Sequence, residues 1–424
     1  MPRTALSKKS RDEHQPPVVL DDFIPTEIGK LANPQTDLPR IARDQRLTAA
    51  IEARLREIPT SHNLHLADAR RMQFLQPESV HLVVTSPPYW TLKEYRDSEG
   101  QLGHVADYET FLRELDEVWK HCYRALVPGG RLIVVVGDVC LSRRKNDGRH
   151  MVVPLHASIQ EHCRTIGFDN LATIIWHKIA NAVYEVENGS GFLGKPYEPN
   201  AVIKNDTEFI LMQRKHGGYR SPSLATRVLS VISADNYQKW FQQIWSGLTG
   251  ASTKHHPAPY PLELAERLVR MFGFVGDTVL DPFAGTGTTT LAASRWGRNS
   301  IGVEVDTDGK RSGDLVCRRL AWCAPRRGGH PGTTRDGRFS CGHRWRRLGE
   351  RKASLGSGTA GQPTQCAPHD RFVDPECAGN GPIARPLRLQ TRNRLVSRRD
   401  RDERSRGLGG RPGPRTKAAR PAAS

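Results

Sequence analysis

Apolar residues are concentrated between residues 62 and 305, where short apolar runs alternate with segments that carry apolar residues at helical spacing. An unbroken apolar run predicts a strand covered on both faces, and a period of 3.6 residues predicts an amphipathic helix. The predicted strands are residues 63–68, 82–85, 131–138, 171–176, 208–212, 278–280 and 300–303. The predicted helices are residues 42–58, 107–126, 152–165, 261–272 and 288–296. Because strands alternate with helices, we expect a doubly wound, mostly parallel, seven-stranded α/β sheet.

Proline and glycine residues mark the ends of several of these elements. Pro59 follows the first helix, and the Pro-Gly-Gly at residues 128–130 is expected to stop the second. About fifteen residues join the first two strands, which is enough for a crossover helix between parallel strands. Residues 1–40 are polar and interrupted by prolines, so we expect a loosely packed arm there.

Composition divides the chain further. Residues 217–253 interrupt the alternation with aromatic and Arg residues, and we interpret them as an insert that faces the substrate. From residue 313 onward the chain is rich in Arg, Gly and Pro without a sustained period, which predicts a largely disordered tail. The expected divisions are 1–60, 61–216, 217–254, 255–312 and 313–424.

The formal net charge of +18 comes almost entirely from the tail. Residues 313–424 hold 25 Lys and Arg against 9 Asp and Glu, which leaves a net charge of +2 for residues 1–312. Global charge is therefore no evidence for nucleic-acid binding. Our hypothesis is that the sequence from about residue 310 comes from a shifted reading frame or a foreign fusion; the alternative is a basic tail that adds non-specific DNA affinity.

The eight cysteines include no Cys-x-x-Cys pair, so we expect no metal site. A zinc site at Cys341 and His343 is the alternative, although metal-ligand spacing is absent there. No segment approaches the roughly 20 apolar residues of a membrane span, and the N-terminus lacks the apolar core of a signal peptide. We therefore expect a cytoplasmic protein without a membrane partner.

Residues 281–287, DPFAGTG, end one predicted strand and lead straight into a helix. Glycines in such a loop let the backbone approach a ligand at the helix N-terminus. Glu304 lies nineteen residues after Gly285, at the end of the next strand, where an acid can accept hydrogen bonds from ribose hydroxyls. Dinucleotide and nucleoside triphosphate loops are disfavoured, because Thr290 replaces the third glycine and no Lys follows. Ordinary turn glycines and a solvated Glu304 remain the alternative.

Residues 85–90, TSPPYW, follow another predicted strand. The Ser86 hydroxyl and the Pro87 carbonyl can accept the two hydrogens of an exocyclic amine, which favours a pyramidal nitrogen that attacks a methyl sulfonium in line. The prolines hold these acceptors in place. Tyr89 offers a stacking face for an extruded base, and Trp90 extends that wall or packs beneath it. A Pro-Pro turn or a polyproline ligand is the alternative.

At these residues the chain resembles the amino-directed DNA methyltransferases that use S-adenosylmethionine, in the permuted order with the base-binding motif before the cofactor motif. The resemblance covers roughly residues 60–306 and implies a Rossmann-like methyltransferase fold. The catalytic residues it implies at the target amine are Ser86, Pro87, Pro88 and Tyr89. The cofactor residues it implies are Asp68, Pro259, Asp281, Phe283, Gly285, Gly287 and Glu304, with Asp68 near adenine and Pro259 in the segment at the methionine end.

Serine in the first position of the SPPY tetrapeptide is similar to cytosine-N4 enzymes, as are residues 195–200 with Thr207 and Glu208. The resemblance thus implies methyl transfer to the N4 amine of cytosine in duplex DNA, with adenine-N6 transfer as the alternative. Cytosine-C5 chemistry is disfavoured because the chain has no Pro-Cys pair to supply the nucleophile. The residues considered for DNA contact, with solvated surface as the alternative for each, are Trp90, Arg220, Arg227 and Lys239.

Two further classes remain open from the sequence. A catalytically impaired DNA-binding protein with a disrupted C-terminus is one, because the chain loses the family resemblance after residues 306–312. An RNA or small-molecule methyltransferase is the other, and the insert before residue 255 weighs against it. We expect a monomer or homodimer whose functional, not physical, partner is a cognate restriction endonuclease.

Overall fold

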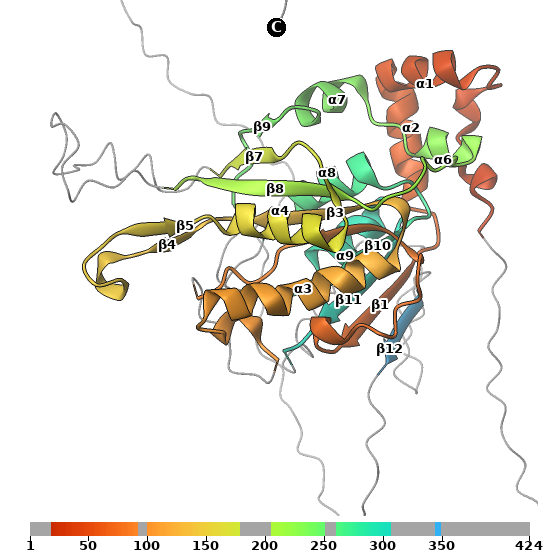
Figure 1. Ribbon diagram of the computed structural model, residues 1–424. Helices are drawn as coiled ribbons and strands as arrows, with labels where there is room; N and C mark the ends of the chain where they lie inside the picture. The colour runs from red at the N-terminus through yellow and green to blue at the C-terminus, as the bar shows by residue number, and fades with distance from the viewer. Residues whose placement is uncertain (1–17, 92–99, 179–204, 251–259, 307–343, 349–424) are drawn as a thin grey trace, which may run out of the picture. The chain divides into compact units, whose positions relative to one another are not determined.

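The computed structural model describes residues 18–91, 100–178, 205–250, 260–306 and 344–348 (Figure 1). All of these residues belong to one compact unit of the chain, Met1–Ala353. Among them, no helix combines the length and the apolar character that crossing a bilayer requires. Cys341 and His343, considered above only as an alternative zinc site, lie outside the described residues, as do all residues of the tail except 344–348.

One ten-stranded sheet organises the described residues. Its order is β12 (Arg344–Leu348), β1 (Ser61–Leu66), β11 (Asn299–Glu304), β10 (Thr278–Asp281), β2 (Val80–Thr85), β3 (Leu126–Val136), β8 (Thr207–Arg214), β7 (Ile174–His177) and β9 (Ile244–Trp245), with β6 (Asp169–Asn170) paired to β8. Strand β8 runs antiparallel to both β3 and β7, whereas β1, β11, β10, β2 and β3 are parallel. The seven predicted strands are confirmed, and β6, β9 and β12 are additional.

Helices cover both faces of this sheet (Figure 1). On one side α3 (Tyr108–Ala125) and α4 (Leu155–Ile166) bury their apolar stripes, and on the other α8 (Leu262–Phe272) and α9 (Thr288–Arg295) do so. Strand β2 serves both cores, because Val83 packs with the α3 side while Leu82 and Val84 pack with the α8 side. This two-sided burial explains the unbroken apolar runs and confirms the predicted α/β class.

The N-terminal segment is more ordered than the sequence predicts. Helix α1 (Pro34–Arg43) precedes α2 (Gln45–Leu55), so the prediction of a loosely packed arm up to residue 40 is wrong. The helix predicted over residues 42–58 is confirmed by α2, which is shorter at both ends. Asp44 separates the helices because its carboxylate caps α2, accepting hydrogen bonds from the amides of Arg46 and Leu47. Ile41 joins the buried cluster of α2, which fixes α1 in place. Two short 3₁₀ helices, Leu20–Phe23 and Thr26–Ile28, precede α1.

The connection between β1 and β2 differs from the prediction, because only a 3₁₀ helix, Ala69–Arg71, lies there instead of a crossover helix. Helix α3 ends at Ala125, within one residue of the predicted end. The Pro-Gly-Gly at residues 128–130 that follows lies inside β3, where the register with β2 shifts between Val80 and Leu82. Gly129 has a φ of 74°, which suits glycine at such a bulge.

The insert after β8 packs against the rest of the unit. Helix α6 (Leu224–Leu229) contributes to the buried cluster of α1 and α2, and α7 (Ala234–Trp240) with β9 contributes two tryptophans to the core beside α8. A hairpin of β4 (Val139–Leu141) and β5 (Met151–Val153) leaves the end of β3 and projects from the body (Figure 1). The remaining 3₁₀ helices are Leu102–His104 and, within that hairpin, Arg143–Lys145.

Candidate active site

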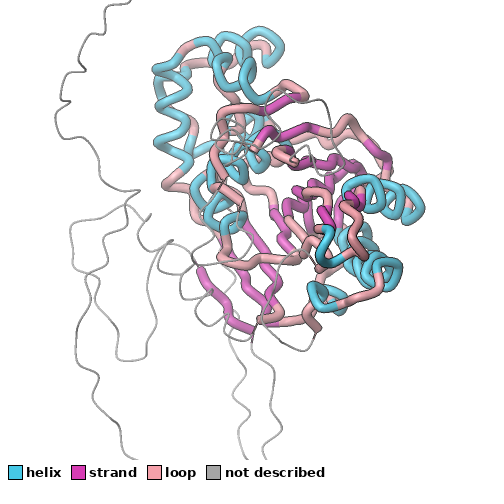
Figure 2. Tube along the Cα trace, turned by 90° about the vertical axis from the view of Figure 1, so that its left-hand side faces the viewer, coloured by secondary structure: helices cyan, strands magenta, loops and turns pink. Residues whose placement is uncertain are grey.

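Two loops begin side by side at the carboxyl edge of the sheet. The base loop, residues 85–90, follows β2, and the cofactor loop, residues 281–287, follows β10. These strands are parallel neighbours, with Leu280 opposite Val83. Figure 2 views the molecule from this edge. The carboxyl ends of parallel strands are where open α/β sheets collect their ligands.

A buried carboxylate ties the two loops together. Asp281 is 2% exposed, and its Oδ1 accepts hydrogen bonds from Thr85 Oγ1 at 2.7 Å and from the Phe283 amide at 3.1 Å. Its Oδ2 accepts from Thr289 Oγ1 at 2.6 Å and from the Tyr260 hydroxyl at 3.3 Å. Burial raises the pKa of Asp281, and these hydrogen bonds oppose the rise by favouring the charged form. The four donors come from both loops, from α9 and from the residue two before α8, so one side chain fixes the spacing of the loops.

The cofactor loop combines glycines in the left-handed region with an acid on the next strand. Gly285 has a φ of 49° and Gly287, which precedes α9, a φ of 75°. Glu304, at the end of β11, accepts hydrogen bonds from the Gly285 amide at 2.7 Å and from the amides of Val305 and Asp306 at 3.1 and 3.0 Å. Burial raises the pKa of Glu304, while the backbone hydrogen bonds work against that rise. Glu304 therefore also fixes the conformation of the cofactor loop, through its hydrogen bond with the Gly285 amide.

Asp68 lies beside Glu304, because β1 pairs with β11 and the Ala67 amide donates to the Glu304 carbonyl at 2.9 Å. Burial alone would raise the pKa of Asp68, but hydrogen bonds and charge from Arg70 outweigh burial and lower it. Arg70 Nη2 lies 2.6 Å from Asp68 Oδ2, and the same guanidinium also contacts Glu114. Asp68 is thus a charged acid in a fixed orientation at the end of β1.

The base loop is packed around Tyr89. The Tyr89 hydroxyl lies 3.4 Å from each of Ser86 Oγ, the Val135 carbonyl and Glu208 Oε2. The ring rests against Gly137, where an added Cβ would lie 3.3 Å from Tyr89 Cε2. Trp90 adopts a φ of 46°, and its indole N–H donates to the carbonyl of Val105 at 2.9 Å. Of the two predicted roles for Trp90, the described contacts favour packing beneath the loop.

An ion pair next to Tyr89 is a feature that sequence reasoning missed. Lys178 Nζ lies 2.6 Å from Glu208 Oε1, and the other oxygen of that carboxylate faces the tyrosine hydroxyl. The hydrogen bonds of Thr85, Thr289 and Tyr260 to Asp281 were missed as well. Only the position of these residues in the sequence indicates a role in the site: each lies in a predicted motif or within a few residues of one.

The part of the chain that contains both loops matches the model of a known protein family. The family model described as DNA methylase, covering N6 and N4 methyltransferases, matches residues 80–312. The chain belongs to this DNA methylase family. The match contains both loops, Asp281, Glu304 and Glu208.

Individual relatives of this DNA methylase agree with the assignment. The Type II methyltransferase M.MjaI of Methanocaldococcus jannaschii is 38% identical over 279 residues, which cover 59% of this chain and 89% of that protein. M.MthZI of Methanothermobacter thermautotrophicus is 35% identical over 283 residues, or 62% of this chain and 77% of that protein. A solved structure of a putative DNA modification methylase from Thermus thermophilus, complexed with S-adenosyl-L-methionine, shares 52% identity and a TM-score of 0.52 over 62% of this chain and 95% of that one.

The DNA methylase is therefore an S-adenosylmethionine-dependent methyltransferase. Its described residues fit that cofactor. Glycines in the left-handed region leave the loop without Cβ atoms where it turns into α9, and the acids Asp68 and Glu304 stand at neighbouring strand ends. A nucleoside offers hydroxyl and amine hydrogens to such acceptors, which is the chemistry expected from the sequence.

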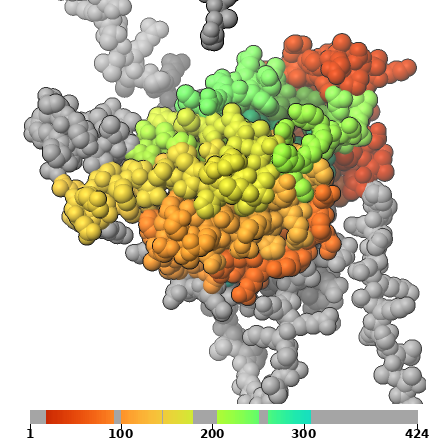
Figure 3. All heavy atoms as spheres, viewed as in Figure 1, coloured from red at the N-terminus to blue at the C-terminus, as the bar shows by residue number. Residues whose placement is uncertain are grey.

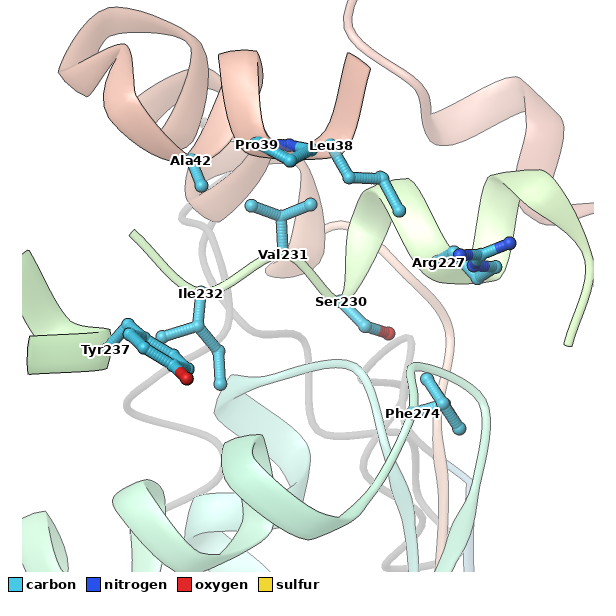
Figure 4. Close-up of a pocket in the computed structure, with 9 residues that line it drawn as sticks. All are labelled: Leu38, Pro39, Ala42, Arg227, Ser230, Val231, Ile232, Tyr237 and Phe274. Atoms are coloured by element: carbon cyan, nitrogen blue, oxygen red, sulfur yellow. The ribbon is translucent and has the colours of Figure 1, made fainter. Parts of the chain in front are cut away.

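Arg220 and Arg227, two of the residues considered for DNA contact, lie away from the two loops. Arg220 donates to both oxygens of Asp277, at 2.9 and 2.7 Å, next to the amino end of β10 and thus at the opposite edge of the sheet. Arg227 lines a cavity of about 350 Å³ between α1 and residues 227–237 (Figure 4). Lys239 is exposed on α7. Pro259 and residues 195–200 lie outside the described residues.

Proposed function

We propose that this DNA methylase transfers the methyl group of S-adenosylmethionine to the exocyclic N4 amine of cytosine in duplex DNA. The observation that carries the proposal is the position of SPPY: it follows β2 directly, and the Thr85 to Asp281 hydrogen bond ties it to the cofactor loop at 2.7 Å. A target amine held at Ser86 would face a methyl group delivered from the neighbouring loop. The order of the motifs along the chain supports the permuted arrangement of the family.

The exocyclic amine of a base is a poor nucleophile, so the base loop has to activate it for attack. In our proposal the Ser86 hydroxyl and the Pro87 carbonyl accept the hydrogens of the amine, which draws the nitrogen lone pair out of conjugation and aims it in line. The cofactor, when bound, supplies an electrophilic methyl on a sulfonium centre. A new N–C bond forms, the bond from sulfur to that methyl breaks, and the amine releases one proton to solvent. Pro88 fixes the loop, and Tyr89 lines the pocket into which the base is flipped.

The cofactor half of the proposal distributes roles among the residues at the strand ends. Asp68 would bind the adenine, Glu304 the ribose hydroxyls, and Phe283 with Gly285 and Gly287 would surround the nucleoside. Asp281 would act through the shape of the loop, because its carboxylate oxygens already accept hydrogen bonds from within the protein. We assign Pro259, which lies outside the described residues, to the methionine end.

The proposed division of labour follows the chain. Residues 61–216 bind the base, residues 255–312 bind the cofactor, and residues 217–254 take part in target recognition, with residues 1–60 as a packing segment and 313–424 as a tail. Arg227 and Lys239 remain candidates for DNA contact, whereas the ion pair of Arg220 supports a structural role. The similarity to Type II methyltransferases supports a restriction endonuclease as the functional partner.

The test identifies the nucleoside that receives the methyl group. Duplex DNA is incubated with the purified protein and S-adenosylmethionine labelled in the methyl, then digested to nucleosides and separated. We expect the label in N4-methylcytosine. Label in N6-methyladenine overturns the choice of base, and an absence of label from every nucleoside overturns DNA methylation and favours an impaired enzyme.

A further inference from the structure

The β4–β5 hairpin is a narrow ribbon rooted beside the base loop. Val139 pairs with Val153 and Leu141 with Met151, and the ribbon extends beyond the body in Figures 1 and 3. At its root, Asp138 Oδ1 lies 2.6 Å from His156 Nδ1 and 3.3 Å from the His156 amide, so both ends of the ribbon are held together. The residue before this root is Gly137, which packs against Tyr89. The ribbon therefore starts one residue from the proposed base pocket.

The tip of the ribbon is folded and positively charged. Arg143 Nε donates to the Gly148 carbonyl at 2.8 Å and Asn146 Nδ2 to the Arg149 carbonyl at 3.1 Å, which closes the turn. Residues 143–150 contain three Arg and one Lys against one Asp, a net charge of +3. Arg144 and Arg149 are both exposed, and within the described ranges neither forms an ion pair.

This charge stands out because the other residues between 1 and 312 are together nearly neutral. Residues 1–312 together carry a net charge of only +2, so the tip is a local excess and not part of a general basic surface. Six residues separate Asp138 from Arg144, which gives an extended reach of about 20 Å at roughly 3.3 Å per residue. Over that length a duplex presents about 12 phosphate charges, at one per about 1.7 Å of its axis. The chemistry at the tip fits such a polyanion.

We propose that the β4–β5 ribbon binds the phosphate backbone of duplex DNA beside the flipped base, with Arg144 and Arg149 as the contacting side chains. The inference rests on the proposed function, which places the target base at Tyr89. The ribbon reads no sequence in this role. It contributes affinity for the duplex beside the pocket.

The test compares two doubly substituted proteins. In the ribbon variant, Arg144→Ala and Arg149→Ala remove two charges while Arg143, which closes the turn, stays. In the control, Arg46→Ala and Arg56→Ala remove two charges from exposed positions in α2 and at its C-cap, where neither side chain forms an ion pair in the described part of the chain. Affinity for a fluorescent duplex is measured by anisotropy from 50 to 200 mM salt, with thermal unfolding as the check on folding.

Each phosphate contact contributes about 0.9 to the slope of log affinity against log salt. We expect the ribbon variant to lose about 1.8 from that slope, so that over this salt range the wild type loses about 12-fold more affinity than the variant. At saturating DNA the variant should keep its turnover, with a raised KM for DNA. The control should keep the slope of the wild type. Equal slopes for all three proteins overturn the proposal.

A second measurement needs no variant. Shortening the duplex on one side to fewer than about six base pairs beyond the target removes the phosphates that lie about 20 Å from it, at roughly 3.4 Å per base pair. When the duplex is shortened on one side of the target, we expect the wild-type slope of log affinity against log salt to fall by about 1.8; shortening on the other side should leave it unchanged. An unchanged slope for both shortened duplexes overturns the ribbon contact. Methyl transfer to the full-length duplex is scored separately. An unchanged slope with normal transfer refutes the ribbon alone, and a changed slope without transfer refutes the proposed function alone.

Discussion

Replacing Thr85 by Val tests whether Asp281 holds the two loops together. The exchange keeps the shape of the side chain and removes the hydroxyl that donates to Asp281 Oδ1 at 2.7 Å. Thr85 is fully buried and Asp281 is 2% exposed, so water does not replace the lost donor. A hydrogen bond to a buried charged group is worth about 1.5–3 kcal/mol. We expect the free energy of unfolding to fall by about 2 kcal/mol, roughly a 30-fold change in the folded-to-unfolded ratio.

The effect should depend on pH in a definite direction. The folded pKa of Asp281 lies above 3.8, so its protonated form favours folding and that contribution is lost as pH rises through the folded pKa. The Thr85 hydrogen bond offsets this loss by stabilising the ionised form. The difference between wild type and Thr85→Val should therefore be largest at neutral pH and shrink as the pH falls through the folded pKa.

Urea unfolding followed by circular dichroism measures the difference, and methyl transfer is assayed on the same samples. Thr165→Val is the control, because its hydroxyl donates to the His162 carbonyl at an exposed position at the end of α4. We expect the control to change stability by less than about 0.5 kcal/mol. If Thr85→Val is as stable as the control, Asp281 is not held by Thr85 and the coupling of the loops through this carboxylate is refuted.

Three further predictions concern single residues around the site. Gly137→Ala should reduce kcat at least about tenfold, because the added Cβ would lie 3.3 Å from the Tyr89 ring and 3.4 Å from Glu208 Cγ. Gly218→Ala is the control, because an added Cβ there meets open space. Equal kinetics for the two variants would contradict the predicted contact. Arg220→Ala should lower stability by about 2 kcal/mol, since it removes the two guanidinium hydrogen bonds to the buried Asp277 while the Phe274 amide still donates to that carboxylate. The salt slope of DNA binding should stay unchanged; a slope reduced by about 1 would return Arg220 to the DNA interface. Asp68→Asn should weaken S-adenosylmethionine binding in calorimetry at neutral pH, and the stability that Asp68 gains from Arg70 should be present above pH 3.8 and disappear as pH falls through its lowered folded pKa; unchanged cofactor affinity would remove Asp68 from the cofactor site.

The sheet could be predicted from the sequence because its central strands β2 and β3 contain unbroken apolar runs that pack on both faces. Val83 packs in the core on one face of the sheet and Val84 in the core on the other face. Such a strand has no solvent-facing position, so its sequence is an unbroken apolar run. The order of the strands could not be predicted in the same way. Nothing local to residues 66–80 indicates that β11 and β10 lie between β1 and β2, so a crossover helix was expected where a single 3₁₀ turn is found.

The candidate site shows the same limit. Sequence reasoning placed both loops at the carboxyl edge because each directly follows a strand, and β2 and β10 are indeed neighbours. It placed Arg220 at the substrate because it lies in an insert rich in aromatic and basic residues, yet its partner Asp277 comes 57 residues later. The pairing of Lys178 with Glu208 joins segments 30 residues apart, and no motif reports it.

The claim that the base loop and the cofactor loop form one site is tested most directly by Ser86→Ala. S-adenosylmethionine affinity is measured by calorimetry, and methyl transfer to duplex DNA is measured on the same protein. We expect the dissociation constant for the cofactor to stay within about twofold while transfer falls at least about 100-fold, as for other lost hydrogen bonds to a transition state. Transfer at the wild-type rate would contradict the assignment of Ser86 and, with it, the account of the site.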